Sequence, residues 1–187
     1  MAKAAEVIRK GGLVVYPTDT VYGLGCDPFD AKAVHRLFEA KGRISKPVPV
    51  LCSSTTKAEA LVRYGPRARA LAKDHWPGAL TIVAPLRKSL PNEVTQGTGK
   101  LGVRVPADEG CRRFISLCGG WLTGTSANLS GRPSARTAIE AWQQIGRSVD
   151  LVLDGGALKG RASTVVEVLQ DKVTILRTGP IGVGKQG

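Results

Sequence analysis

The sequence predicts an α/β protein in which a mixed β-sheet is flanked by helices. Short apolar segments rich in β-branched residues alternate with segments of helical periodicity early in the chain, whereas strand-like segments cluster near its end. The 187 residues are 42% hydrophobic and 22% charged, which is typical of a globular domain with a sizeable core. We therefore expect one domain over residues 1–187, with a flexible Gly-rich tail from about residue 178.

Local patterns place the individual elements. The segments with strand character are 13–16, 48–52, 80–84, 101–105, 121–125, 151–153, 163–169 and 172–177. Helices are expected before Gly11 and over 30–41, from 55 or 56, and over 66–73, 107–118 and 137–146. Asp30 is a typical N-cap and Pro66 a typical first helical residue. Polar loops follow two of the strands, over 17–25 and 126–133.

The charge balance points to an anionic partner. Lys and Arg number 27 against 15 Asp and Glu, a net charge of +12. This excess suits nucleic acid or a phosphate-bearing small molecule, although a generally basic surface that aids solubility is an alternative. Only 5% of the residues are aromatic, which argues against a single-strand binder that stacks bases. No apolar run is long enough for a membrane span and no secretory signal is visible, so a cytoplasmic location is expected.

Several familiar motifs are present only in part, so the functions they usually indicate are not expected here. Cys26, Cys52, Cys111 and Cys118 lack the spacing of zinc ligands, so free thiols and no side-chain metal site are expected. The glycines at 97, 99 and 102 precede a strand, whereas a dinucleotide-binding loop follows one. A near-match to a Walker A loop at the C-terminus has Gln186 where Ser or Thr is required. Ser126 lacks the G-x-S-x-G elbow of a hydrolase.

Four polar segments remain as candidates for a binding site. The loop Pro17–Gly25 follows a buried strand, although it also suits an ordinary turn. Three cations within 41–46 suit a polyphosphate clamp or, alternatively, a helix C-terminus. Arg104 lies in an apolar strand and requires an anion, either a ligand or an internal Asp or Glu. The hydroxyl-rich stretch 123–134 suits nucleotide phosphates, or is simply a capped loop.

Taken together and in this order, the segments resemble the YrdC/Sua5 family of threonylcarbamoyl-AMP synthases. The resemblance runs from about residue 5 to 179 and rests on PTDTVYGLG, KGR followed by KP, HWPGALT, GVRVP, SANLSGRPS, STVV and ILRTG. It implies a twisted mixed sheet around a large, positively charged cavity. It also implies synthesis of threonylcarbamoyl-AMP and pyrophosphate from L-threonine, bicarbonate and ATP, for the t6A37 modification of tRNA. Mg²⁺ is expected to enter with the ATP phosphates.

The resemblance assigns roles to individual positions. For L-threonine it implies Thr20, Arg104, Gly124 through its backbone, and Ser163. For ATP it implies Arg43, Lys46, Lys100, Ser126, Asn128, Ser134 and Arg177. Lys41 and Arg43 are expected to be the catalytic cations at the phosphates. The expected partners are the three substrates, proteins that transfer the threonylcarbamoyl group, and tRNA or double-stranded RNA.

The sequence also departs from the family pattern. Ile44 stands where many relatives have Pro, and the segment 48–52 lacks a polar residue that some relatives place near threonine. The chain ends soon after ILRTG, as in the short single-domain type. Two alternatives share the fold: a non-catalytic RNA-binding module, and a paralogue that acts on another carbamoyl-adenylate.

Overall fold

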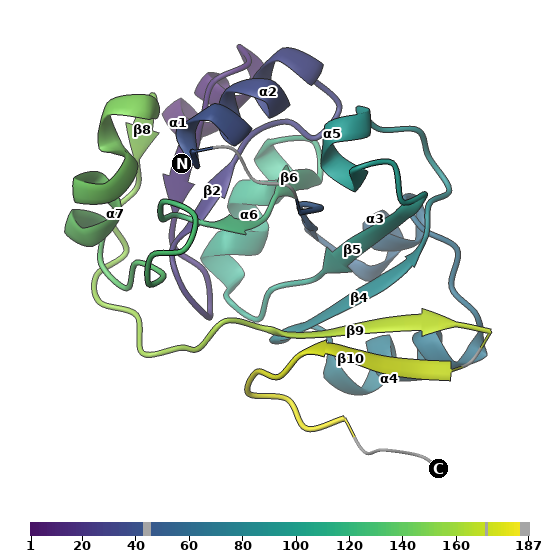
Figure 1. Cartoon of the computed structure of the whole chain (residues 1–187). Coiled ribbons are helices and arrows are strands. Elements are labelled where there is room, and N and C mark those ends of the chain that lie inside the picture. The colour runs from purple at the N-terminus through teal and green to yellow at the C-terminus, as the bar shows by residue number, and fades with distance from the viewer. Residues whose placement is uncertain (43–45, 171, 184–187) are drawn as a thin grey trace.

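The computed structural model describes residues 1–42, 46–170 and 172–183, and within them ten strands form two mixed sheets (Figure 1). The smaller sheet has the order β7 (Thr125–Ser126), β2 (Gly23–Gly25), β1 (Val14–Tyr16), β8 (Leu151–Val152). The larger sheet has the order β10 (Lys172–Arg177), β9 (Thr164–Leu169), β4 (Leu80–Pro85), β5 (Lys100–Arg104), β3 (Val50–Cys52), β6 (Trp121–Thr123). Each sheet contains parallel and antiparallel pairs, so the predicted α/β class with mixed pairing is confirmed.

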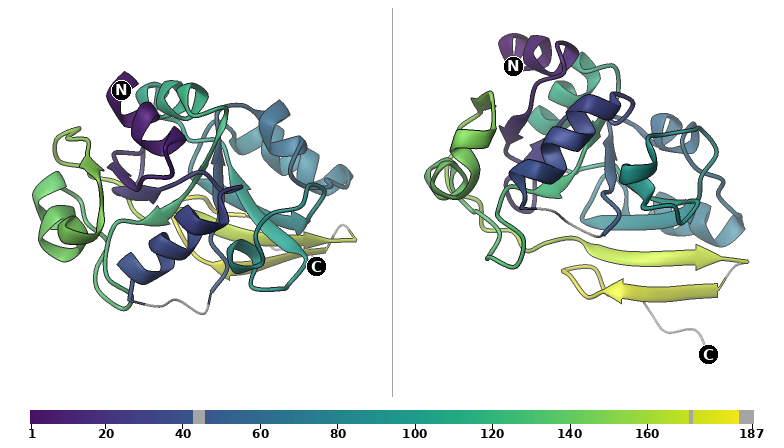
Figure 2. Two further views of the ribbon diagram at one scale, coloured as in Figure 1. Left: turned by 90° about the horizontal axis from the view of Figure 1, so that it is seen from above. Right: turned by 45° about the horizontal axis from the view of Figure 1, so that its top comes forward.

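Helices surround the two sheets. They are α1 (Ala2–Arg9), α2 (Ala31–Ala40), α3 (Thr55–Glu59), α4 (Pro66–His75), α5 (Asn92–Thr95), α6 (Glu109–Leu117), α7 (Ala138–Ile145) and the 3₁₀ turn η1 (Gly146–Ser148). The capping predictions hold, since Asp30 accepts hydrogen bonds from Lys32 N and Ala33 N, and Pro66 opens α4. Figure 2 shows α7 and β8 at one end of the molecule and α4 toward the other.

Gly124 explains why the strands divide between two sheets. The sequence predicts one strand over 121–125, but β6 pairs with β3 in the larger sheet and β7 pairs with β2 in the smaller one. Between them, Gly124 N donates to Pro49 O at 2.7 Å. A Cβ on Gly124 would lie 2.5 Å from Leu51 Cγ, so only glycine allows this approach. One continuous segment therefore passes from sheet to sheet at the point where Gly124 contacts β3.

Two hydrophobic clusters hold the layers together. In the smaller cluster, α1 and α6 bury Ile8, Phe114 and Ile115 against Tyr16 of β1 and Leu122 of β6. The larger cluster lies among α2, α4 and the strands of the larger sheet. Burial of the apolar side chains in these two clusters is the main favourable contribution to folding. Within the described residues, the helices are too short or too polar to cross a membrane.

Three local features differ from the sequence prediction. β2 lies within the loop expected over 17–25, and α5 lies between the strands expected over 80–84 and 101–105, where no helix was predicted. Residues 178–183 were assigned to a flexible tail, but Gly179 N and Ile181 N donate to Thr164 Oγ1 at 3.1 and 3.0 Å. Val183 is buried in the larger cluster. The remaining residues of the expected tail, 184–187, lie outside the described part of the chain.

Candidate functional site

A cavity of about 440 Å³ lies where the two sheets and their loops meet. Nine residues that the sequence assigned to the site line it together: Lys41, Lys46, Arg104, Gly124, Ser126, Asn128, Ser134, Ser163 and Arg177. They come from segments that are far apart in sequence, and the fold brings them to one place. The apolar part of the wall includes Val48, Pro49 and Leu51, in the segment where a polar residue is missing.

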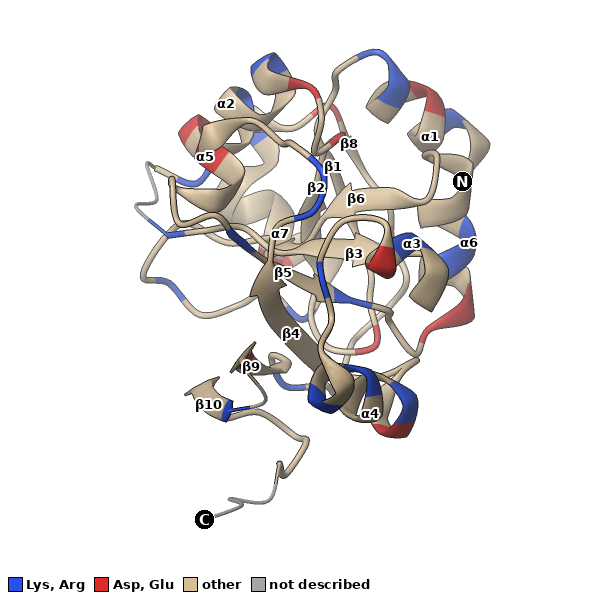
Figure 3. Cartoon of the chain, turned by 90° about the vertical axis from the view of Figure 1, so that its right-hand side faces the viewer, with Lys and Arg blue, Asp and Glu red and all other residues tan. Residues whose placement is uncertain are grey.

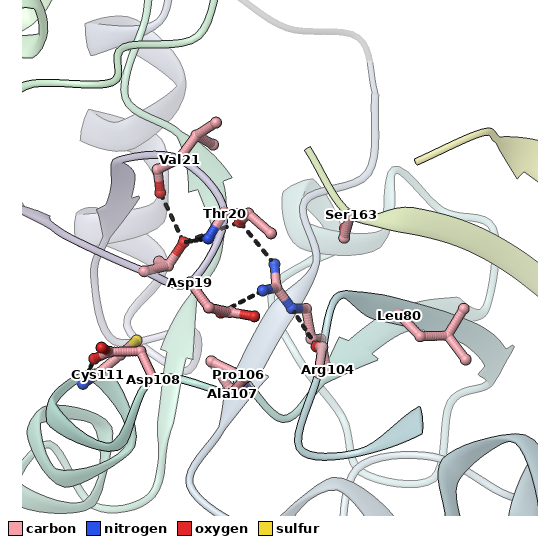
Figure 4. Close-up of polar contacts among 12 residues, drawn as sticks. Asp19, Thr20, Val21, Leu80, Arg104, Pro106, Ala107, Asp108, Cys111 and Ser163 are labelled. Carbon is pink, nitrogen blue, oxygen red and sulfur yellow. Dashed lines mark hydrogen bonds and ion pairs between the residues drawn. The ribbon is translucent and has the colours of Figure 1, made fainter. Parts of the chain in front are cut away.

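Arg104 at the end of β5 is a buried cation with an internal partner. Its guanidinium donates through Nε to Gly78 O at 2.9 Å, through one terminal nitrogen to Thr20 Oγ1 at 3.1 Å, and through the other to the Asp19 carboxylate. Figure 4 shows Asp19 and Thr20 approaching it from the loop that follows β1. A guanidinium has five N–H donors, so two remain for a ligand. The internal acid that the sequence left open as an alternative is therefore Asp19.

Ser163 and Arg177 form a second polar group in the cavity wall. The Ser163 hydroxyl lies 2.9 Å from Thr81 Oγ1 and accepts a hydrogen bond from Arg177 at 3.1 Å. Arg177 Nε also donates to Ser163 O at 3.0 Å. Burial, and to a smaller extent the nearby Arg104, lowers the pKa of Arg177 below its ordinary value. Two arginines thus hold positive charge at the same end of the cavity.

Lys41, which follows α2, is held by the loop after β7. Its Nζ donates to Asn128 O at 2.8 Å and also to Ser126 O, and only 3% of the residue is exposed. Burial lowers the pKa of Lys41 from 10.5 to about 8, since the described residues provide carbonyl dipoles but no carboxylate for it. The cation expected at the ATP phosphates is thus bound to the backbone of the loop that carries Ser126 and Asn128.

Asn128 keeps that loop in shape. Its Nδ2 donates to Leu129 O at 2.8 Å and to Arg132 O at 2.7 Å. Its Oδ1 is buried and has no hydrogen-bond partner among the described residues. A buried acceptor without a partner is costly, so this atom is available to a donor from a ligand.

Lys100, which the resemblance assigns to ATP, is not among the described residues that line the cavity. It begins β5, whereas Arg104 ends it, and its Nζ makes an ion pair with Glu167 of β9 at 2.9 Å. Thr20 contacts Arg104 but does not line the cavity itself. Arg43 lies outside the described residues.

Sequence reasoning missed Asp19 and Thr81. For Asp19 the available signal was a buried arginine that needs a carboxylate.

Comparison with known proteins shows the family of the chain. Residues 6–179 match the Sua5/YciO/YrdC family model, described as telomere recombination, and the chain belongs to this family. It is 38% identical to a threonylcarbamoyl-AMP synthase of Pyrococcus abyssi over 94% of this chain and 53% of that protein. It is 39% identical to one of Idiomarina loihiensis over 83% of this chain and 87% of that protein. The chain thus spans about half of the archaeal relative and most of the bacterial one.

Solved structures agree with this assignment. The structure of P. abyssi Sua5 complexed with L-threonine superposes with a TM-score of 0.91 at 38% identity, over 95% of this chain and 53% of that one. Escherichia coli YciO superposes with a TM-score of 0.88 at 27% identity, over 96% of this chain and 88% of that one. The expected family fold is therefore confirmed.

Proposed function

We propose that this protein is a threonylcarbamoyl-AMP synthase that makes threonylcarbamoyl-AMP and pyrophosphate from L-threonine, bicarbonate and ATP. The observation that carries the proposal is that three of the four residues assigned to threonine and five of the seven assigned to ATP line one cavity. The relatives named for this activity, and the relative complexed with L-threonine, support it.

The reaction has two steps. The threonine amine adds to the carbon of bicarbonate or carbon dioxide and forms a carbamate, with water as the other product when bicarbonate reacts. A carbamate oxygen then attacks the α-phosphorus of ATP, and the bond to the bridging oxygen breaks to release pyrophosphate. Such a transfer depends on positioning and charge neutralisation more than on a nucleophilic side chain. Mg²⁺ would be held by the ATP phosphates and would neutralise their charge.

Different residues of the cavity suit the two larger substrates, L-threonine and ATP. The two free N–H groups of Arg104 suit the threonine carboxylate, and Ser163 and the Gly124 backbone complete that pocket. Lys46, Ser126, Asn128, Ser134 and Arg177 suit ATP. Lys41 is placed to shape the loop of Ser126 and Asn128 through its two carbonyl contacts. We extend the proposal to a cytoplasmic enzyme that supplies t6A37 synthesis.

Pyrophosphate release tests the proposal. The purified protein is given ATP, Mg²⁺, bicarbonate and L-threonine, and each is omitted in turn. Release that requires both threonine and bicarbonate is the expected result. Release that is indifferent to threonine, or no release from protein that binds ATP, would contradict the synthase.

An RNA-binding module is the second candidate, because the chain carries a net charge of +12. Figure 3 shows Lys and Arg spread over the helices and loops of one side. Binding through phosphate contacts would fall steeply with salt concentration. A titration of tRNA at two salt concentrations therefore separates this candidate from an enzyme whose turnover changes little with salt.

A further inference from the structure

A second cavity adjoins the first. It measures about 600 Å³ and shares Val21, Ser134 and Ala162 with the cavity already described. We call it the annex, and its other lining residues are Arg132, Pro133, Arg136, Glu140, Gln144, Gly160 and Arg161. Three arginines from two separate segments of the chain thus line a space that opens next to Ser134, one of the residues assigned to ATP.

The backbone that carries these arginines is fixed by hydrogen bonds. Asn128 Nδ2 donates to Arg132 O at 2.7 Å, and Leu158 N donates to Arg136 O at 2.8 Å. Gly160, next to Arg161, packs so closely on the loop after β1 that a Cβ there would lie 2.3 Å from Thr20 O. The backbone walls of the annex are therefore fixed. Asn128, which lines the first cavity, holds the backbone of Arg132 through its carbonyl.

The annex differs from the first cavity in how far its arginine side chains are engaged by the protein itself. Among the described residues, the side chains of Arg132, Arg136 and Arg161 make no ion pair or hydrogen bond. Glu140 is the one acid in the wall, and its Oε2 accepts from Arg136 N at 2.6 Å. In the first cavity, by contrast, Arg104, Arg177 and Lys41 are engaged by protein groups.

We propose that the annex binds pyrophosphate as it leaves the first cavity, an assignment that rests on the proposed function. Pyrophosphate carries several negative charges, and the planar guanidinium binds phosphate oxygens in pairs. Ser134 lines both cavities, so an anion bound beside this residue has the annex arginines in the adjoining space. The annex is then the product-release site, and no bond forms or breaks in it.

Two measurements test the annex: calorimetric titration with pyrophosphate alone, and inhibition of turnover by added pyrophosphate. The test variant is R132Q/R161Q, which changes two exposed side chains. The control is R113Q, which removes an exposed arginine on α6, outside both cavities. We expect R132Q/R161Q to weaken pyrophosphate binding and inhibition about tenfold or more, with the KM for threonine and the melting temperature unchanged. R113Q should match the unchanged protein.

Three outcomes decide the matter. Equal pyrophosphate affinity in R132Q/R161Q and R113Q overturns the annex. Unchanged pyrophosphate affinity with specific loss of tRNA binding in R132Q/R161Q also overturns it and assigns the arginines to a nucleic acid. Arginine-dependent pyrophosphate binding in a protein that shows no threonine-dependent turnover supports the anion site while refuting the synthase, so the two proposals fail separately.

Discussion

Arg104 and Lys41 are both buried cations in the wall of the cavity, 4% and 3% exposed, yet the protein balances their charges differently. Arg104 has a carboxylate partner in Asp19, together with a hydroxyl and a carbonyl. Lys41 has two backbone carbonyls. Burial of a charge is expensive unless an opposite charge lies nearby, and only Arg104 has such a partner among the described residues.

The difference separates two ways of building a binding site. The loop after β1 fixes the orientation of the Arg104 guanidinium, as a rigid carboxylate receptor requires. At the other end, Lys41 donates hydrogen bonds to the backbone of the loop that carries Ser126 and Asn128, and burial lowers the pKa of Lys41 to about 8. The Lys41 end can therefore respond to a change of pH.

Arg104→Gln should have the largest effect. Loss of the guanidinium removes the charged contact with threonine and leaves Asp19 without its cation, so kcat/KM for threonine should fall about 100-fold or more. ATP affinity, measured by calorimetry, should change little. Threonine affinity equal to that of the unchanged protein would show that the carboxylate binds elsewhere.

A pH series tests the Lys41 end. The pKa of Lys41 is about 8 in the folded protein against 10.5 for an ordinary lysine, so the unfolded chain binds more protons between these values. The free energy of unfolding should therefore rise with pH in this window, by about 2 kcal/mol between about pH 7.5 and about pH 9.5. Lys41→Met should lack this rise. Equal slopes in denaturant titrations of the two proteins would mean that Lys41 keeps an ordinary pKa.

Lys41→Met also separates a positioning role from a catalytic one. Without the lysine, Ser126 O and Asn128 O lose a donor and the loop loses its anchor, so affinity for a non-hydrolysable ATP analogue should fall about tenfold. The kcat at saturating ATP should change less than the affinity. Loss of kcat with unchanged affinity would instead make Lys41 a cation that acts on the reacting phosphates.

The sequence predicts most elements because their signals are local. The helix after Asp30 and the strands predicted over 163–169 and 172–177 agree closely with α2, β9 and β10. β2 was not predicted because Gly23 and Gly25 have low strand propensity, and its pairing with β1 and β7 makes it a strand. The change of sheet at Gly124 depends on contact with Leu51, which is distant in sequence.

The site was predictable as a set of segments but not as a set of contacts. Lys100 and Arg104 begin and end one strand, about 13 Å apart along the extended chain, and of the two only Arg104 lines the cavity. The partners of Arg104 and Lys41 follow from the approach of loops that are about 85 residues away in sequence. Residue types alone do not encode such pairings.

Asp19→Asn should have the smallest effect of these substitutions. It also tests most directly whether Arg104 needs a charged partner, which Lys41 lacks. Asparagine keeps an acceptor oxygen beside Arg104 but removes the negative charge, whereas Asp19→Ala removes both. If Asp19 mainly orients the guanidinium, the KM for threonine should rise about tenfold in the alanine variant and less than about threefold in the asparagine variant. Asp74→Asn, on the exposed part of α4, is the matched control. Equal damage from Asn and Ala would show that the charge of Asp19, more than its geometry, prepares Arg104 for threonine.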